Sequence, residues 1–393
     1  MPEQLSNLRL MIVAGEPSGD AHAASLVTAI HAAAPETHME FFGATGPLMR
    51  AAGVETIIDS DELAIFGIIE VAAAFPKFLH AFRKLKQVAL ERKPDAVILV
   101  DWPEFNLRLA KALHKHSLKI IHYISPQLWA WRSYRLNQMR RDIDLLLSIF
   151  QFEVDWFARR GMNQVAYVGH PLAGKVHARF DRLEFCRLNN LDPARPIIAL
   201  LPGSRRKELA RILPPMIDAA SLIAAGHHEI QFVLVVAPSR SLPEVDDVLL
   251  KVKINESLKT RLRIVEHQTR ETLAAADAAA ICSGTATLEA ALLNIPMVIV
   301  YKESVVNWHT LGRLTHPDHY GLPNIVAGRR LFTELMQNDL TPQRLATELL
   351  ALLDTERQTE LRNELQKIRE QLGEADASRT AAERILHAVA SWQ

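Results

Sequence analysis

The sequence predicts an α/β protein with two Rossmann-like, doubly wound domains that face a cleft, and a helical tail. Short apolar segments alternate with helical segments in the first half of the chain, which is the pattern of a parallel sheet covered on both faces. After about Lys175 the alternation starts again. The length of 393 residues corresponds to two or three domains of roughly 150 residues each. We therefore expect domains at 1–175 and 176–365 and a tail at 366–393.

The first domain begins with the most distinct strand. Residues 8–14 form a continuous apolar run with one arginine, ended by Gly15, as expected for a strand buried on both faces of a parallel sheet. A helix is expected over 20–34. Further strands of the same character are expected at 39–46, 95–101, 118–125 and 144–150, with helical segments between them.

The second domain has the same organisation without a repeat at the level of residues. Its strands are expected at 196–204, 231–239, 261–267, 278–284 and 295–301. The tail is predicted to be helical from about Thr341, with a break at Gly373 before a last helix. Ligands of open parallel sheets bind beyond the carboxyl ends of the strands, so the residues that follow each strand are the candidates for chemistry.

The composition excludes several classes of protein. Two cysteines, Cys186 and Cys282, cannot make a disulfide scaffold or a multi-cysteine metal site, and they suit a reducing cytosol. The 16 histidines show no metal-ligand spacing, so neither a metal nor another cofactor is expected. Basic and acidic residues number 45 each, without the basic excess of a nucleic-acid-binding protein. No apolar run approaches the roughly 18 residues of a membrane span, and no signal peptide is recognised.

The balanced charge hides a strongly basic region in the first half. Residues 77–141 contain 14 basic and four acidic side chains, so one face should attract anions. An aromatic stripe with helical spacing lies at the start of this region. Such stripes are common in hydrophobic cores, but the basic neighbours favour an interfacial segment on an anionic membrane. We expect these side chains to face the membrane: Phe66, Ile68, Ile69, Phe75, Phe78 and Phe82.

Two loops after strands of the first domain carry candidate catalytic groups. The segment from Gly15 to Asp20 offers a glycine turn and a helix N-terminus, although its spacing alone favours Ser18 or Asp20 as a helix cap. Asp101 ends a buried strand, where a desolvated carboxylate can act as a general base. A turn or capping role is an equal alternative for Asp101, and Glu104 is a competing acid.

A third loop of the first domain is rich in tryptophan. Trp129 and Trp131 lie beside Arg132, after the strand at 118–125. Two such rings can stack on a sugar or line an acyl chain. The alternative is a corner of the hydrophobic core, because tryptophan is highly buried on average.

The second domain has two glycine turns that run into helices. Gly203, Ser204 and Arg205 combine a turn, a hydroxyl and a guanidinium at a helix N-terminus, which suits a diphosphate. Gly284 and Thr285 begin the other turn, and Glu289 follows one helical turn later, where its carboxylate can accept both hydroxyls of a ribose. Helix capping is the structural alternative in both places.

Seven segments together resemble one enzyme family, the lipid-A-disaccharide synthases, which are inverting glycosyltransferases of the GT-B type from Gram-negative lipid A assembly. They occur in the family's order and spacing over nearly the whole chain: AGEPSGD, VDWPEFN, YISPQLWAWR, VGHPL at 168–172, LPGSR, SGTATLE and LPNIVAGR at 322–329. The resemblance implies transfer of 2,3-diacylglucosamine from its UDP derivative to the 6-hydroxyl of 2,3-diacylglucosamine 1-phosphate. The products are a β(1→6) disaccharide 1-phosphate and UDP, formed with inversion and without a metal.

The resemblance also implies roles for individual residues. Asp101 is the candidate general base, Arg205 neutralises the leaving diphosphate, and Asn324 lies near the donor. The other substrate-binding candidates, some already named above, are Glu16, Ser18, Gly203, Ser204, Gly284, Thr285, Glu289, Trp129 and Trp131. The residues alone leave open whether Asp101, Glu104 or His122 takes the proton.

The resemblance further implies a cytoplasmic enzyme, peripherally associated with the anionic surface of the inner membrane. The last helix is expected to pack back on the first domain, and exchange of chain ends in a homodimer is a further hypothesis. Two alternatives remain at this stage: a UDP-N-acetylglucosamine 2-epimerase, and a UDP-sugar-binding membrane module without activity. An epimerase would not need the apolar and basic segment at 66–86.

Overall fold

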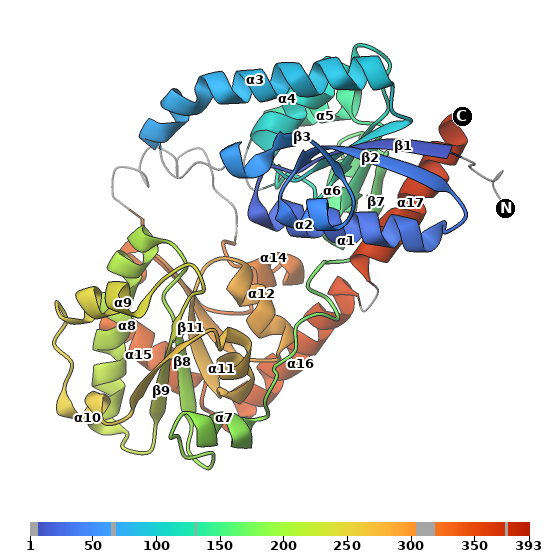
Figure 1. The fold of residues 1–393 in the computed structure, drawn as a ribbon. Helices are drawn as coiled ribbons and strands as arrows, with labels where there is room; N and C mark the ends of the chain where they lie inside the picture. Colours follow the sequence, from blue (N-terminus) through green and yellow to red (C-terminus); the bar gives the residue numbers. More distant parts are fainter. Residues whose placement is uncertain (1–6, 64–67, 130–131, 304–318, 374–375) are drawn as a thin grey trace. The chain divides into compact units, whose positions relative to one another are not determined.

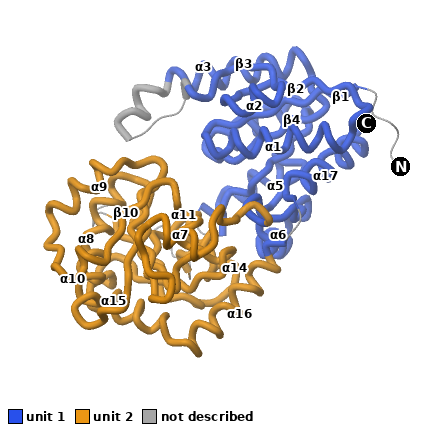
Figure 2. Tube along the Cα trace, turned by 60° about the horizontal axis from the view of Figure 1, so that its bottom comes forward, with its two compact units in different colours: residues 1–173, 372–393 blue, residues 174–371 orange. Residues whose placement is uncertain are grey.

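The protein was analysed as a computed structural model, which describes residues 7–63, 68–129, 132–303, 319–373 and 376–393. The chain divides into two units (Figure 2). Unit 1 comprises residues 1–173 and 372–393, and unit 2 comprises residues 174–371. The sequence places the corresponding boundaries at 175 and 365.

Unit 1 is built on a parallel sheet with the order β3-β2-β1-β4-β5-β6-β7. The central strands consist almost entirely of buried apolar residues, because both faces of the sheet are covered by helices. The order reverses between β1 and β4, so the loops after these two strands open at the switch point where doubly wound sheets bind ligands. The strands are β1 (Asn7–Val13), β2 (His38–Thr45), β3 (Glu55–Asp59), β4 (Ala96–Val100), β5 (Ile120–Tyr123), β6 (Leu145–Ser148) and β7 (Val165–Tyr167).

The helices of unit 1 form a layer on each face of this sheet (Figure 1). One core includes α1 and α17, and the other includes α3, α4 and α5. The helices are α1 (Pro17–Ala33), α2 (Pro47–Ala51), α3 (Ile68–Arg92), α4 (Pro103–His114), α5 (Leu136–Asp142), α6 (Gln151–Ala158) and α17 (Ala377–Trp392), with short 3-10 turns η1 (Ser60–Leu63) and η2 (Ser133–Arg135).

Unit 2 has a second parallel sheet with the order β10-β9-β8-β11-β12-β13. Its switch point lies between β8 and β11. The strands are β8 (Ile197–Leu201), β9 (Gln231–Val236), β10 (Leu262–Glu266), β11 (Ala278–Cys282), β12 (Met297–Tyr301) and β13 (Glu334–Met336). The helices are α7 (Arg182–Leu188), α8 (Arg206–Gly226), α9 (Leu242–Leu249), α10 (Glu256–Lys259), α11 (Thr269–Ala275), α12 (Thr285–Leu292), α14 (Leu322–Ala327), η4 (Gln337–Asp339), α15 (Pro342–Ala351) and α16 (Thr355–Leu372).

The C-terminal helix returns to unit 1, as predicted. Helix α16 ends at Leu372, and Gly373 follows in the left-handed conformation with φ +75°, which glycine adopts without strain. Helix α17 then packs along α1 (Figure 1). Four small or aliphatic side chains of α17 enter the core that α1 shares with the sheet: Ala381, Ala382, Ile385 and Val389. The last residues of the chain are therefore part of the first domain.

Helix α8 is the one described helix that is long and apolar enough to cross a membrane by length and composition. Half of that segment is buried within the structure. Its apolar face, which includes Ile212, Met216 and Ile217, is fully buried. The helix therefore serves as a core helix of unit 2.

All ten strands predicted from apolar runs are present; β1 and β2 are shifted by one residue from their runs, and the other eight are shorter than theirs. The structure adds β3, β7 and β13, which have only five, three and three residues. These strands lie at sheet edges, and their apolar runs are too short to distinguish them from the surrounding loops. Helix α1 begins at Pro17 rather than Asp20, because proline is tolerated in the first turn.

Candidate active site

The loop after β4 has an unusual backbone at the position of Asp101. Asp101 and Trp102 both have φ +49°, a left-handed conformation that non-glycine residues adopt at a cost of about 1–3 kcal/mol. The Asn106 side-chain amide holds this turn, since its nitrogen donates to the carbonyl oxygens of Val100 at 3.2 Å and Asp101 at 2.7 Å. Such strain is typical of positions that orient a functional side chain.

The surroundings of Asp101 favour a proton acceptor. Burial raises the pKa of its carboxyl above the usual value, and the negative charge of Glu16 raises it further, against a lowering by the Trp102 backbone amide. Glu16 lies at the end of the β1–α1 turn and precedes α1. The two carboxyl groups therefore interact at the switch point of unit 1, where the sequence places candidate catalytic groups. A carboxylate with a raised pKa is a stronger base than an exposed one.

Neighbouring candidates in unit 1 have structural partners. The Asp20 carboxylate accepts hydrogen bonds from the backbone amides of Gly46, Leu48 and Met49 at 2.9–3.0 Å, so it caps α2. Ser18, in the first turn of α1, and Glu16, directly before the helix, are exposed. At Gly15, a Cβ atom would lie 2.2 Å from the Trp102 ring, which explains why this position is glycine.

The two alternative bases are less suited to the role than Asp101. Glu104 is exposed and forms ion pairs with Arg132 and Arg135, and the Arg135 guanidinium donates to both its oxygens at 2.8–2.9 Å. His122 is fully buried in β5, and burial lowers its pKa to about 4. Neither ring nitrogen of His122 has a hydrogen-bond partner among the described residues. His122 is therefore a neutral core residue.

The tryptophan loop is fixed by a buried acid that sequence reasoning missed. The Trp129 indole N–H donates to the Glu153 carboxylate at 2.9 Å, and the Ser148 hydroxyl donates to the same group. Burial raises the pKa of Glu153 to about 7, although these hydrogen bonds act in the opposite direction. Trp129 is half-buried through this contact. Trp131 lies outside the described residues.

Two members of the predicted membrane-facing set, Phe78 and Phe82, are described, and both are partly buried. Phe78 and Phe82 pack against the core between α3, α4 and the sheet. Phe78 lies 5.9 Å from Trp102, and Phe82 lies 6.0 Å from Phe105, measured between ring centroids. Helical spacing identifies the apolar face of α3, but that face covers the sheet. Phe66 lies outside the described residues, and the side chains of Ile68, Ile69 and Phe75 are not described.

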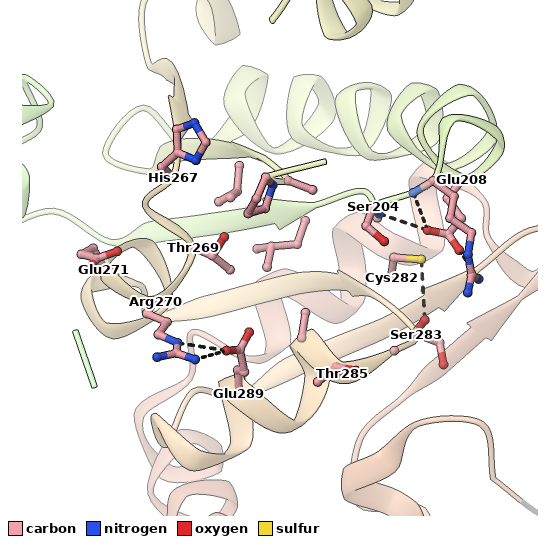
Figure 3. A pocket seen from close by; sticks show the side chains of 18 of the residues that line it. Ser204, Glu208, His267, Thr269, Arg270, Glu271, Cys282, Ser283, Thr285 and Glu289 are labelled. Carbon is pink, nitrogen blue, oxygen red and sulfur yellow. Dashed lines mark hydrogen bonds and ion pairs between the residues drawn. The ribbon is translucent and has the colours of Figure 1, made fainter. Parts of the chain in front are cut away.

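Unit 2 has a cavity of about 650 Å³ at the carboxyl ends of its strands, within the usual size of ligand sites. Figure 3 shows that the Arg270 and Glu289 side chains face each other on one side of this pocket, while Ser204, Glu208 and Cys282 lie on the other. Six of the predicted donor-site residues line it: Gly203, Ser204, Arg205, Gly284, Thr285 and Glu289. The structure therefore brings these six predicted residues together around one cavity.

Next to the turn that was predicted to hold a diphosphate lies an acid that was not predicted from the sequence, Glu208. Glu208 accepts hydrogen bonds from the backbone amides of Ser204 and Arg205, both at 3.1 Å, and from the Arg205 guanidinium at 3.0 Å. A Cβ atom at Gly203 would lie 2.6 Å from the Glu208 carboxylate, and Gly203 has φ +113°. The Arg205 side chain remains 79% exposed and thus accessible to a ligand.

The turn after β11 presents the N-terminus of α12 to the same pocket. The Ser283 hydroxyl donates to the Tyr320 carbonyl at 3.0 Å, and the Thr287 hydroxyl donates to the Gly284 carbonyl at 2.7 Å. Gly284, Thr285 and Ala286 line the cavity. Backbone N–H groups at a helix N-terminus favour an anion, so this turn and Arg205 can hold a diphosphate from two sides.

Asn324 has a different position from the one expected. It is fully buried, and its amide nitrogen donates to the Phe332 carbonyl and the Glu334 carboxylate, both at 2.9 Å. Its oxygen accepts from the backbone amides of Leu331 at 2.9 Å and Phe332 at 2.8 Å. These four bonds use the whole capacity of the side chain. The structure therefore gives Asn324 no free group for catalysis, and it holds the turn next to β13.

A pair of charged residues in the pocket shows where sequence reasoning could have gone further. Arg270 contacts Glu289 from the first turn of α11, directly after the short loop that follows β10, and the carboxyl end of this predicted strand was not considered as a site. The same rule that selected Asp101 and Arg205 would have selected this loop.

Comparison with known proteins gives consistent matches over nearly the whole chain. The family model described as lipid-A-disaccharide synthetase matches residues 10–389. The chain is 41% identical over 382 residues to the lipid-A-disaccharide synthase of Trichlorobacter lovleyi, covering 97% of each chain. It is 40% identical over 373 residues to that of Nitrosococcus oceani, covering 95% of this chain and 94% of the relative.

Solved structures of low sequence identity share the fold. The glycotransferase of kitacinnamycin matches with a TM-score of 0.63 and 14% identity, covering 97% of this chain and 99% of that one. A putative UDP-N-acetylglucosamine 2-epimerase from Listeria monocytogenes matches with a TM-score of 0.62 and 16% identity, covering 98% and 96%. The fold is therefore the GT-B-like arrangement of two α/β units that the sequence predicts.

Proposed function

The chain belongs to the lipid-A-disaccharide synthase family, and from this premise we propose how its residues divide the reaction. It is a glycosyltransferase that transfers 2,3-diacylglucosamine from UDP-2,3-diacylglucosamine to 2,3-diacylglucosamine 1-phosphate. The products are the β(1→6) disaccharide 1-phosphate and UDP. Family membership replaces the epimerase alternative, because similarity to an epimerase at 16% identity concerns the fold alone.

The pocket of unit 2 is proposed to bind UDP of the donor. This rests on the observation that groups suited to a diphosphate and to a ribose line one cavity from opposite sides. Arg205 and the N-terminus of α12 hold the diphosphate, while Glu289 accepts hydrogen bonds from the ribose hydroxyls. Gly203, Ser204, Gly284 and Thr285 form the walls of the phosphate side.

Asp101 is proposed to be the general base of unit 1. Its carboxylate takes the proton of the acceptor 6-hydroxyl, and the oxygen attacks the anomeric carbon of the donor. The bond from that carbon to the diphosphate oxygen breaks, so the configuration inverts and UDP leaves. Arg205 stabilises the charge that develops on the leaving diphosphate, which makes a metal unnecessary. Glu16, Ser18 and the tryptophan loop line the acceptor side. Asn324 takes no part in the chemical step and only holds the turn next to β13.

The acceptor is a lipid, and an anionic membrane surface is the proposed place of reaction. Exposed basic side chains of α3 and α4 support this, among them Arg83, Lys84, Arg108 and Lys111. Phe78 and Phe82 are partly buried against the core, so the proposal rests mainly on electrostatic attraction rather than on an apolar contact. We further propose a cytoplasmic enzyme at the inner membrane.

Exchange of α17 in a homodimer stays a hypothesis, which a sedimentation mass of one chain at micromolar concentration would count against.

The direct test is product formation from both lipid substrates in detergent micelles with EDTA. We expect disaccharide and UDP in equal amounts, and UDP release only when the lipid acceptor is present. Arg205→Gln should lower kcat by about 10²–10³-fold, as for loss of one well-placed stabiliser of a developing anion. Arg206→Gln is a matched control, because Arg206 is exposed next to Arg205 but does not line the pocket. Absence of product from a folded wild type would reject the proposal.

A further inference from the structure

Arg270 connects three segments of unit 2 through one guanidinium group. Its Nε and Nη2 atoms both lie 2.9 Å from Oε1 of Glu289, and its Nη1 donates to the Lys175 carbonyl at 3.0 Å. Arg270 belongs to α11, Glu289 belongs to α12, and Lys175 belongs to the segment 174–181 that precedes α7. Figure 3 shows the guanidinium and the carboxylate facing each other at the pocket.

The contact leaves one oxygen of Glu289 for a ligand. The Glu289 side chain is 17% exposed, so it has lost most of its contact with water. Both Arg270 nitrogens bind Oε1, and among the described residues no hydrogen bond is recorded to Oε2. A carboxylate held in this way cannot turn freely about its last torsion, which is otherwise broad. Arg270 thus fixes the direction in which Oε2 points.

Arg270 also balances the charge of the pocket. Glu208, Glu271 and Glu289 all line the cavity in which an anionic diphosphate is proposed to bind. Arg205 pairs with Glu208, Arg179 pairs with Glu271, and Arg270 pairs with Glu289. Without Arg270, a partly buried carboxylate would face the nucleotide uncompensated, which costs free energy.

We propose that Arg270 is a positioning residue for ribose recognition, because it holds the Glu289 carboxylate against the sugar hydroxyls and ties it to the Lys175 backbone. This inference rests on the proposed donor site. It predicts that Arg270 contributes to the distinction between a ribose and a deoxyribose, and not merely to the stability of the pocket. The Glu289 carboxylate is a charged acceptor that distinguishes ribose from deoxyribose by a hydrogen bond from the one hydroxyl that deoxyribose lacks.

Arg179 is a second side chain that anchors the segment 174–181, and it allows ribose recognition to be separated from the stability of the pocket. Arg179 donates from Nε to Glu271 at 2.7 Å and from Nη2 to the His267 carbonyl at 3.0 Å. It therefore ties residues 175–179 to the loop after β10 without contacting Glu289. Loss of Arg179 should disturb the pocket wall for every nucleotide, whereas loss of Arg270 should affect the ribose contact selectively.

The experiment compares Kd values of UDP and 2′-deoxy-UDP by calorimetry on the full chain. A hydrogen bond to a charged group corresponds to a ratio of roughly 10–100 in favour of UDP for the wild type. We expect this ratio to fall below about threefold in Arg270→Gln and to be partly restored in Arg270→Lys. Arg179→Gln should weaken both ligands by the same factor. Arg187→Gln, which removes an exposed guanidinium of α7, should leave the ratio as in the wild type.

The possible failures are distinguishable. A wild-type ratio in folded Arg270→Gln, checked by circular dichroism, would overturn the role of Arg270 alone, whatever the change in overall affinity. Selective loss of the ratio in Arg179→Gln but not in Arg270→Gln would also overturn it. Equal binding of both ligands by the wild type would reject ribose recognition by Glu289, and absence of UDP binding would reject the donor site itself.

Discussion

Asp101 combines a left-handed backbone with a carboxyl whose pKa is raised by burial and by Glu16. A general base must be ionised to act, so the raised pKa should place the acidic limb of kcat/KM above the ordinary range of an aspartate. Glu16→Gln removes the negative charge that helps to raise this pKa. The limb should therefore shift to lower pH in Glu16→Gln, measured as kcat/KM against pH.

The control for this shift is an acid of the same unit that does not interact with Asp101. Glu104→Gln changes a carboxylate that is paired with Arg132 and Arg135. The acidic limb of kcat/KM in this variant should therefore coincide with that of the wild type. An acidic limb that stays in place in Glu16→Gln, with activity high enough to measure it, would contradict the coupling of the two carboxyl groups.

Glu153 makes a prediction for stability rather than activity. Its pKa rises from 4.5 to about 7 on folding, chiefly by burial. Below pH 4.5 both states hold the proton. As the pH rises towards 7, the unfolded state loses its proton first, so the free energy of unfolding falls by about 3 kcal/mol and then levels off. Glu153→Gln should abolish this fall in urea unfolding between pH 5 and 8. Glu256→Gln, which changes an exposed acid, should retain it.

Single residues were predictable from the sequence only where the fold class alone determines their surroundings. Asp101, Arg205 and Glu289 follow strands, and the strand-end rule selects them without knowledge of any partner. Arg270, Glu153 and Glu208 act through tertiary contacts, which a single sequence does not contain. Asn324 is the opposite case. The family motif predicted a role near the donor, but the four hydrogen bonds of its side chain give it a structural role.

At the scale of elements, helix α17 is as much a part of unit 1 as α1. Ile385 is fully buried between α1 and the sheet. Truncation to alanine should lower the free energy of unfolding of unit 1 by about 2–5 kcal/mol, the usual cost of a large-to-small change in a core. His387→Ala, an exposed position on the same helix, should change stability little. Equal stability of Ile385→Ala and the wild type in thermal unfolding would contradict the packing of α17.

The predicted elements show what periodicity can and cannot decide. Continuous apolar runs identified the central strands because these are buried on both faces. The three-residue strands β7 and β13 are too short to give a pattern. In α3, helical spacing found the apolar face correctly, but core and membrane produce the same stripe. Phe78 contacts Trp102 and Phe82 contacts Phe105, so part of each ring packs against the core while the rest stays exposed.

At the scale of the whole molecule, the local basic excess should direct unit 1 to an anionic surface. Arg83→Gln with Lys84→Gln removes two exposed charges of α3. At about 1 kcal/mol for each charge, binding to vesicles that contain anionic lipid should weaken roughly 30-fold at low salt. Lys251→Gln with Lys253→Gln removes two exposed charges of unit 2 and should bind as the wild type does. Co-sedimentation without any difference between the two double variants would contradict the proposed surface.

The central claim is that Asp101 takes the proton from the acceptor hydroxyl, and the most direct measurement is the rate of disaccharide formation by Asp101→Asn. Asparagine keeps nearly the same size but removes the base. The account predicts a rate about 10²–10⁴-fold below that of the wild type, with unchanged Kd for UDP, because the donor pocket belongs to unit 2. Asp101→Asn with wild-type turnover of the two lipid substrates would contradict the account.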